Sequence, residues 1–178
     1  MKNRLALAAA FVLLFSCLTG CVRAEPVDLH TVADSELVNT AFYIAAEHAD
    51  AYENYADYME SDAPEAQKTL YVAWKYDMEV QNGGLCQFFV NPSRALAPYL
   101  EDVLHTIRAD SHRELFHSFV QENDIDINDL SSFIIRSVDE FQEQNERYPF
   151  DDFDKAFMRL PSIYDYMFAF VKAHMDEF

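Results

Sequence analysis

The chain has 178 residues, of which 51% are hydrophobic and 15% aromatic, so a single globular domain with a sizeable core is expected and a disordered acidic tail is excluded. Its formal net charge of −18 argues against direct binding of nucleic acid, because an acidic surface repels the phosphate backbone. The three glycines leave little room for a glycine-rich phosphate loop or for an all-β fold with glycine turns.

Residues 1–20 have the pattern of an export signal. Two basic residues precede an uncharged apolar run over 5–15, which is shorter than the roughly 20 residues that a membrane-spanning helix needs. The next four residues, Leu-Thr-Gly-Cys, end at Cys21 and resemble the lipobox of bacterial lipoproteins. That resemblance implies cleavage before Cys21 and attachment of lipid to its thiol. The alternatives are a secretory signal cut near Ala24 and a short uncleaved anchor.

Cleavage before Cys21 has consequences for charge, disulfides and location. The mature chain would have a side-chain charge of −20, because the two basic residues of the signal are lost. Cys86 would be its one remaining free thiol, so no intrachain disulfide is expected. Two or three acyl chains give stable anchoring, which predicts a protein of the bacterial cell envelope. Val22, in place of the aspartate that often marks inner-membrane retention, favours the outer membrane.

After a tether over 21–33, residues 34–178 are predicted to form one all-α domain of about six to eight helices. Apolar residues recur there at intervals of three and four, which is the period of one helix face. The first helix is predicted to begin at a cap on Asp34 or Ser35 and to continue to about Glu60. The other predicted helical or short segments cover residues 64–81, 85–90, 95–109, 110–120, 128–146, 151–159 and 161 onward.

The sequence contains no pattern typical of a catalytic, metal-binding or cofactor-binding site. His112 and His117 are five residues apart, so they point about 140° apart around a helix. The segment 124–135 begins like a calcium loop but lacks the glycine and the bidentate glutamate that such a loop needs. Cys86 lies in an apolar stretch, which predicts a buried and inert thiol. We therefore expect a non-enzyme with no catalytic residue, no metal and no cofactor.

Acidic residues dominate the first part of the predicted domain. Residues 24–67 contain eleven acidic residues and no Lys or Arg. Five of them recur at helical spacing and define an acidic row, about 20 Å long on one helix, beside the apolar stripe: Glu47, Asp50, Glu53, Asp57 and Glu60. A second, shorter row contains Asp139, Glu143 and Glu146. The acidic row predicts a basic partner and electrostatically steered association, with acidity that serves only solubility as the alternative.

The end of the second predicted helix carries a distinctive motif. Residues 77–91 read DMEVQNGGLCQFFVN. Asn82-Gly83-Gly84 predicts a helix stop, since glycine adopts the left-handed conformation at little steric cost. The acidic helix end, the Asn-Gly-Gly and the Gln-aromatic-aromatic-x-Asn that follows resemble the signature of a bacterial helical family. That family is named for an acidic mimic of double-stranded DNA, and the resemblance covers roughly residues 36–178.

The resemblance implies an all-α domain, often a homodimer, and in the naming member surface carboxylates stand in for phosphates and occupy DNA-binding proteins. We interpret the motif itself as structural. Gly83 and Gly84 would form the turn, while Gln87 and Asn91 would bond backbone ends. Phe88 and Phe89 would enter the core. Mimicry depends instead on surface carboxylates, and the acidic row is the candidate.

Together these observations predict a lipid-anchored, non-enzymatic protein that binds a basic protein partner through the acidic row. An immunity-like protein that neutralises a basic toxin in the envelope is an alternative. A hydrolase with a carboxylate pair around Asp77 and Glu79 is a hypothesis of a different class. The third alternative is a passive envelope component whose acidity serves only solubility.

Overall fold

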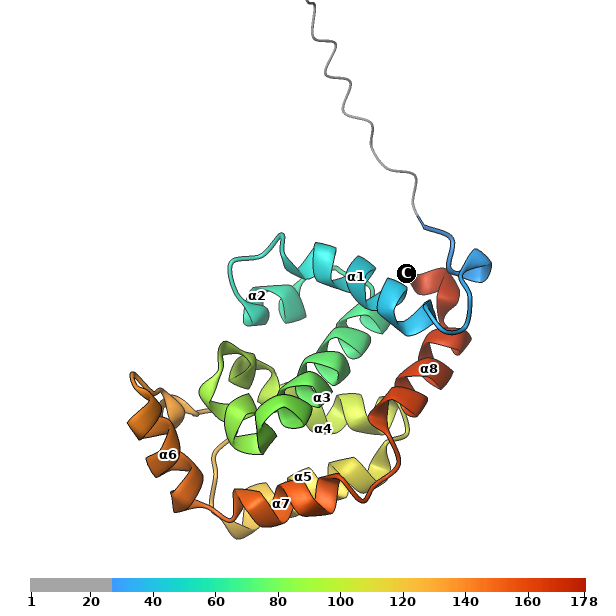
Figure 1. Ribbon diagram of the computed structural model, residues 1–178. Helices are drawn as coiled ribbons and strands as arrows, with labels where there is room; N and C mark the ends of the chain where they lie inside the picture. The colour runs from blue at the N-terminus through green and yellow to red at the C-terminus, as the bar shows by residue number, and fades with distance from the viewer. Residues whose placement is uncertain (1–26) are drawn as a thin grey trace, which may run out of the picture.

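The computed structural model describes residues 27–178, and within them the chain forms eight α-helices, four short 3₁₀ helices and no strand (Figure 1). This confirms the predicted all-α fold. The predicted signal peptide and Cys21 lie outside the described residues. Among the helices described, none combines the length and the hydropathy needed to cross a membrane.

The α-helices are α1 (Leu37–Ala49), α2 (Tyr55–Glu60), α3 (Glu65–Val90), α4 (Ala97–Thr106), α5 (Asp110–Glu122), α6 (Val138–Arg147), α7 (Phe150–Phe157) and α8 (Ile163–Ala173). The 3₁₀ helices are η1 (Leu29–Thr31), η2 (Pro92–Leu96), η3 (Ser131–Phe133) and η4 (Met175–Glu177).

Helix α3 lies at the centre of the fold and packs against α1, α4, α6, α7 and α8 (Figure 1). Its residues 66–73 are buried on every side of the helix, as expected for a helix surrounded by others. Farther along, Tyr76, Phe88 and Phe89 are fully buried, and both Tyr76 and Phe89 contact the ring of Phe116. Burying a ring of this size contributes about 1.5–3 kcal/mol, so these aromatic contacts hold the two ends of α3 in one core.

The first predicted helix, 34–60, is wrong in its length, because the chain leaves the helical path after Ala49. Asn54 then adopts an extended conformation and caps α2, its side-chain oxygen accepting a hydrogen bond from the Asp57 backbone N–H at 3.0 Å. The predicted cap at Asp34 or Ser35 is also wrong, because α1 begins after Glu36 without a side-chain cap. Two short helices therefore replace one long one.

The predicted helix over 128–146 is wrong in its first half. Residues 128–137 contain only the short η3, and α6 begins after Ser137, whose side chain caps it by accepting from the Glu140 N–H at 3.2 Å. Ile134 and Val138, apolar residues at helical spacing within that predicted helix, are 54% and 73% exposed. The helices predicted near 95–109, 110–120 and 161 onward are confirmed as α4, α5 and α8, and each has a buried apolar face.

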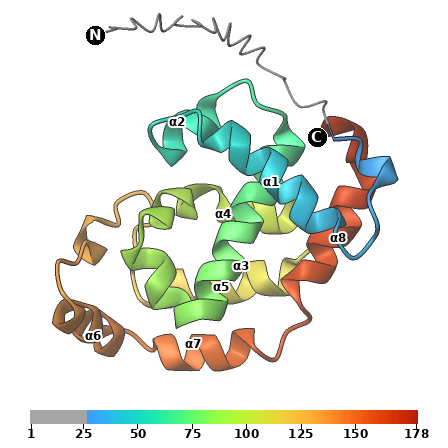
Figure 2. The ribbon, with the colours of Figure 1, turned by 45° about the horizontal axis from the view of Figure 1, so that its top comes forward.

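The two ends of the described chain meet. Figure 2 shows η1 beside η4, and a hydrogen-bonded pair joins His30 to Asp176 at 2.8 Å. Asp34 pairs with Lys172 at 2.9 Å. Leu29, at the start of this segment, is buried. The part of the predicted tether that the structure describes is therefore packed against the domain.

Candidate functional site

The Asn82-Gly83-Gly84 segment forms a kink inside α3, so the predicted helix stop is an interruption after which the helix resumes. Gly84 has a φ of 77°, in the region that favours glycine. The carboxylate of Asp154, from α7, accepts a hydrogen bond from the Leu85 backbone N–H at 2.9 Å and caps the resumed helix. Burial raises the pKa of Asp154, and the bond from Leu85 opposes that rise. A side chain at Gly84 would overlap this carboxylate, so the glycine serves both the backbone angle and the close approach.

The second half of the motif surrounds a buried carboxylate. Glu79 is only 7% exposed, and its two oxygens accept hydrogen bonds from Gln87 at 2.7 Å, Asn91 at 2.8 Å and Ser93 at 2.9 Å. We call these four residues the Glu79 clasp. No cation pairs with Glu79 among residues 27–178, so neutral donors alone satisfy this charge. The clasp ties both sides of the kink to η2.

The Glu79 clasp corrects one prediction and confirms another. Gln87 and Asn91 were expected to bond backbone ends, but both donate to the Glu79 side chain across the kink. Phe88 and Phe89 are fully buried, as expected of core residues. Sequence reasoning missed Glu79 as a buried centre. Its spacing from Tyr76, three residues earlier on the buried face of α3, was the available signal.

The carboxylate pair proposed for a hydrolase is not assembled at α3. Asp77 and Glu79 are two residues apart on a helix, so their side chains point about 160° apart. Asp77 is half-buried and burial raises its pKa, whereas both oxygens of Glu79 are already hydrogen-bonded. In the part of the chain that the structure describes, no group of three His, Cys, Asp or Glu side chains is placed to hold a metal ion.

The acidic row is broken into three parts. Glu47 lies on α1, Asp50 and Glu53 lie in the connection between the helices, and the other two members lie on α2. All five side chains are exposed, and none of them forms an ion pair within the described residues. Asp57 accepts a hydrogen bond from the Asn54 side chain at 2.9 Å, so it also holds the start of α2. The carboxylates are available to a partner, but not as one straight line.

The connection between α1 and α2 forms one wall of a hollow of about 540 Å³, which we call the tyrosine hollow. Tyr52 and Tyr55 line it from this wall, and Tyr71 lines it from α3. Two members of the acidic row, Asp50 and Glu53, also line it. Lys75 of α3 and three residues of η2, among them Arg94, complete the lining. Segments about 40 residues apart in sequence thus meet around three aromatic rings.

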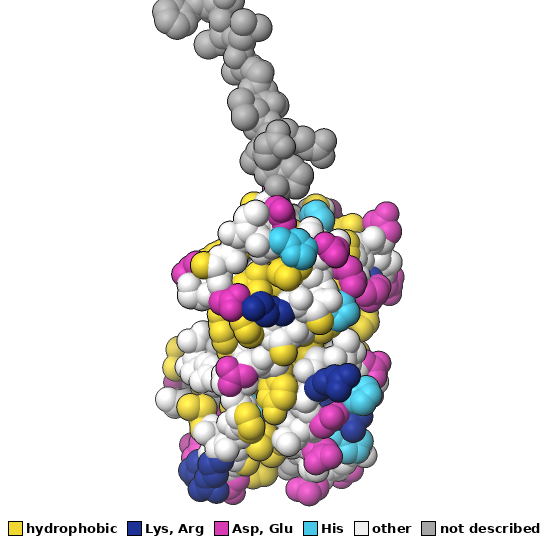
Figure 3. Space-filling view, turned by 90° about the vertical axis from the view of Figure 1, so that its right-hand side faces the viewer, with side chains coloured by type: hydrophobic (Ala, Val, Ile, Leu, Met, Phe, Trp, Pro, Cys, Tyr) yellow, Lys and Arg dark blue, Asp and Glu magenta, His cyan; other side chains and the backbone are white. Residues whose placement is uncertain are grey.

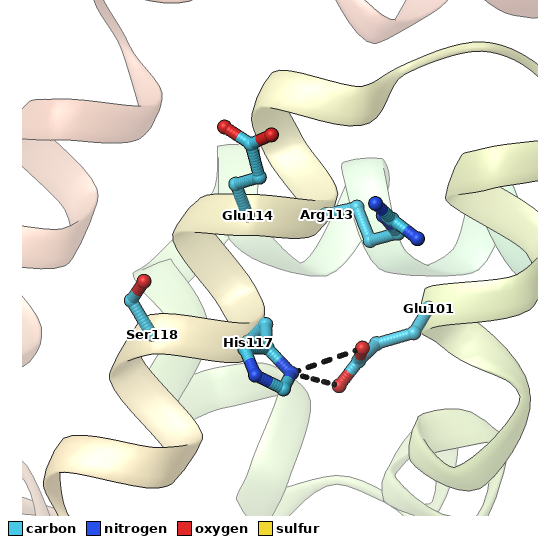
Figure 4. Close-up of a pocket in the computed structure, with 5 residues that line it drawn as sticks. All are labelled: Glu101, Arg113, Glu114, His117 and Ser118. Atoms are coloured by element: carbon cyan, nitrogen blue, oxygen red, sulfur yellow. Dashed lines mark hydrogen bonds and ion pairs between the residues drawn. The ribbon is translucent and has the colours of Figure 1, made fainter.

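A smaller hollow of about 200 Å³ lies between α4 and α5. Figure 4 shows His117 on α5 facing Glu101 on α4, with an Nδ1–oxygen distance of 3.1 Å. Arg113, Glu114 and Ser118 complete its lining, and no aromatic ring contributes to it. On the face shown in Figure 3, basic and histidine side chains lie among the acidic ones. The acidic charge is therefore mixed with positive charge on that face.

Two titratable side chains, Cys86 and His112, are buried in the core. Cys86 is a free, fully buried thiol, which confirms its predicted burial, and burial raises its pKa to about 12. His112 is 1% exposed against the rings of Phe157 and Tyr166, and burial lowers its pKa to about 4. Its Nδ1 has no hydrogen-bond partner. Neither group faces a described hollow, so both belong to the core.

Comparison with known proteins adds one match. Residues 61–174 match the model of a family described as DMP19-like protein. The matched segment covers more than half of the chain and includes the kink, the Glu79 clasp and Asp154. It begins at Ser61, after α2, so the acidic row lies before it. No curated protein and no solved structure matches the chain.

Proposed function

The chain belongs to the family of DMP19-like proteins, and we propose that it is a non-enzymatic binding module that contacts a basic protein partner through the carboxylates of the acidic row. The observation that supports this is the exposure of all five carboxylates without an ion pair in residues 27–178. Some acidic side chains elsewhere do have cationic or histidine neighbours, as Asp34 has Lys172 and Glu101 has His117. The five carboxylates of the acidic row are therefore free to pair with positive charges of a partner.

Physical chemistry favours a basic partner for this surface. Asp57 and Glu60 are like charges three residues apart on α2, which destabilises that helix by a few tenths of a kcal/mol, and an incoming cationic surface relieves the repulsion. Complementary charge also accelerates encounter and makes association sensitive to salt, with a screening length of about 8 Å at physiological ionic strength. The same acidity opposes direct contact with nucleic acid.

We further propose that lipid on Cys21 anchors the protein in the cell envelope, where the basic partner would then be found. An incoming toxin is one such partner, which is the immunity-like version of this function. Fractionation with fatty-acid labelling tests the anchor by comparing the native chain with Cys21→Ala. Loss of both label and membrane association in the variant supports lipidation. An unlabelled, uncleaved protein in the cytosol contradicts it and redirects the search to cytoplasmic DNA-binding proteins.

The binding proposal is tested with a defined cationic probe, a decalysine peptide. The native protein should bind it at low salt and lose affinity steeply between 20 and 200 mM salt. Reversal of Glu47, Asp50 and Glu53 to Lys should reduce the affinity at least ten-fold without lowering the unfolding midpoint. Asp57 is left intact because it bonds the cap of α2.

A matched control keeps the total charge constant. Asp139, Glu143 and Glu146 on α6, when reversed to Lys, change the net charge by the same amount at a different place. This variant should keep most of the affinity. An equal loss in both triple variants would mean that only net charge matters, and it would contradict a binding surface on α1 and α2.

A further inference from the structure

We propose that the tyrosine hollow receives an arginine side chain of the basic partner. This inference rests on the proposed function, because it assigns a chemical group to the partner and a place for it. The hollow lies within the acidic row, since Asp50 and Glu53 belong to both. Its volume of about 540 Å³ is larger than a guanidinium needs and admits an arginine together with flanking main chain.

The chemistry of the lining favours arginine over lysine. Tyr52 and Tyr55 are half-buried, so each ring is held by packing while part of it remains accessible. Tyr52 contacts the buried ring of Tyr58, and Tyr55 contacts the buried ring of Tyr71. A planar guanidinium stacks on such rings and pairs with a carboxylate through two parallel hydrogen bonds, whereas an ammonium is a compact, strongly hydrated charge.

The hollow already binds a cation of its own chain to one of its rings. The Lys75 Nζ lies 5.4 Å from the centre of the Tyr71 ring, within the range of a cation–π contact. Lys75 forms no ion pair within the described residues, and its ammonium group contacts the Tyr71 ring instead. An incoming guanidinium would compete with Lys75 for the ring of Tyr71.

The second basic residue of the lining is occupied elsewhere. The Arg94 Nη1 donates to the backbone oxygens of Val90 at 2.9 Å and Asn91 at 3.0 Å, at the end of α3. Its guanidinium thus caps a helix terminus, where a positive charge complements the free carbonyl groups. Of the two basic residues in the lining, Lys75 is therefore the one that an arginine would have to displace. Removal of Lys75 should consequently strengthen arginine binding, which can be tested.

The experiment compares decaarginine with decalysine, which carry equal charge, by titration against the full chain. The native protein should bind decaarginine at least five-fold more tightly. Tyr55→Leu should bring the two affinities within two-fold of each other, whereas Tyr55→Phe, which keeps the ring, should retain the preference. Tyr43→Leu changes a tyrosine that is 71% exposed on α1 outside the hollow, and it should behave as the native protein does.

Lys75→Gln is the decisive variant, because the direction in which it changes decaarginine affinity tests the inference. It leaves every packed ring of the hollow in place. Removal of the resident cation should strengthen decaarginine binding by about two- to five-fold. Weaker binding would overturn the inference and indicate an anionic or zwitterionic occupant. Equal affinity for the two peptides in the native protein, still lost on reversal of Asp50 and Glu53, would overturn the arginine site while the proposed function stands. Absence of binding by either peptide at low salt would overturn both.

Discussion

Acidic side chains have opposite surroundings in the two halves of this fold. In the kinked region of α3, Glu79 is buried with three hydrogen-bond donors, and Asp154 accepts from a helix N–H. In the α1–α2 segment, the five carboxylates of the acidic row are exposed and without ion pairs in the described residues. The family match covers the first region and stops short of the second. The family match therefore bears on the kinked region, whereas binding must be argued from residues that precede the matched segment.

The largest expected effect is that of Glu79→Ala, which removes the acceptor of three side-chain donors. The buried Ser93 and the half-buried Gln87 and Asn91 would lose their acceptor, so we expect the free energy of unfolding to fall by about 2–4 kcal/mol. Denaturant unfolding monitored by circular dichroism measures this. Asp50→Ala, in the acidic row, should change the same quantity by no more than about 0.5 kcal/mol. Similar losses in the two variants would remove the distinction between the regions.

His112 gives the buried region a pH dependence of definite sign. Its pKa is about 4 in the folded protein against an ordinary value of 6.5, because burial disfavours the charged ring. The unfolded chain therefore binds a proton first as the pH falls, and stability present above pH 6.5 is lost toward pH 4, by about 2–3 kcal/mol. Asp77 and Asp154, whose pKa values are raised by burial, act in the opposite direction at the acidic end.

His112→Phe separates these contributions, because it removes only the imidazole titration. The difference in unfolding free energy between the native protein and this variant should shift by about 2–3 kcal/mol between pH 7 and pH 4. Denaturant titrations at four or five pH values measure the shift. A constant difference across that range would show that His112 has the same pKa in the folded and unfolded states, and it would contradict the lowered pKa of the buried ring.

The spacing of apolar residues predicted those helices in which the buried face and the two ends are both marked in the local sequence. Leu100 and Leu104 on α4, like Met167 and Val171 on α8, lie on apolar faces that the structure buries. The break at Asn54 was missed because the three- and four-residue spacing continues through it, although Asn followed three residues later by Asp is a capping pattern. In residues 128–137 the same spacing arises without a helix, and exposed apolar side chains result.

The candidate sites were less predictable because they join residues across turns. The partners of Glu79 lie eight to fourteen residues away, beyond a kink whose geometry decides whether they meet. The tyrosine hollow joins the α1–α2 connection to η2, and no local period relates these segments. Sequence indicated the residue types, while the tertiary fold determined which of them face each other.

The smallest expected effect concerns residues with a positive φ. The motif places a glycine at such a position, whereas two positions elsewhere carry residues with side chains. Glycine occupies the positive φ of the kink, at Gly84, but Arg108 and Asp124 adopt φ values of 66° and 51° just after α4 and α5. The left-handed conformation costs a residue with a side chain about 1–2 kcal/mol, and less for aspartate, which bonds locally. Glycine also loses more entropy on folding, which offsets part of the gain.

We therefore expect Arg108→Gly to stabilise the protein by about 0.5–1 kcal/mol and Asp124→Gly to have an effect close to zero. Both helix ends keep their closing bonds, from the Ala109 N–H to Leu104 at 2.8 Å and from the Ile125 N–H to Val120 at 3.0 Å, because these involve backbone alone. Thermal unfolding of the two variants measures the difference. A loss of stability in Arg108→Gly would mean that the Arg108 side chain contributes more than its backbone strain removes.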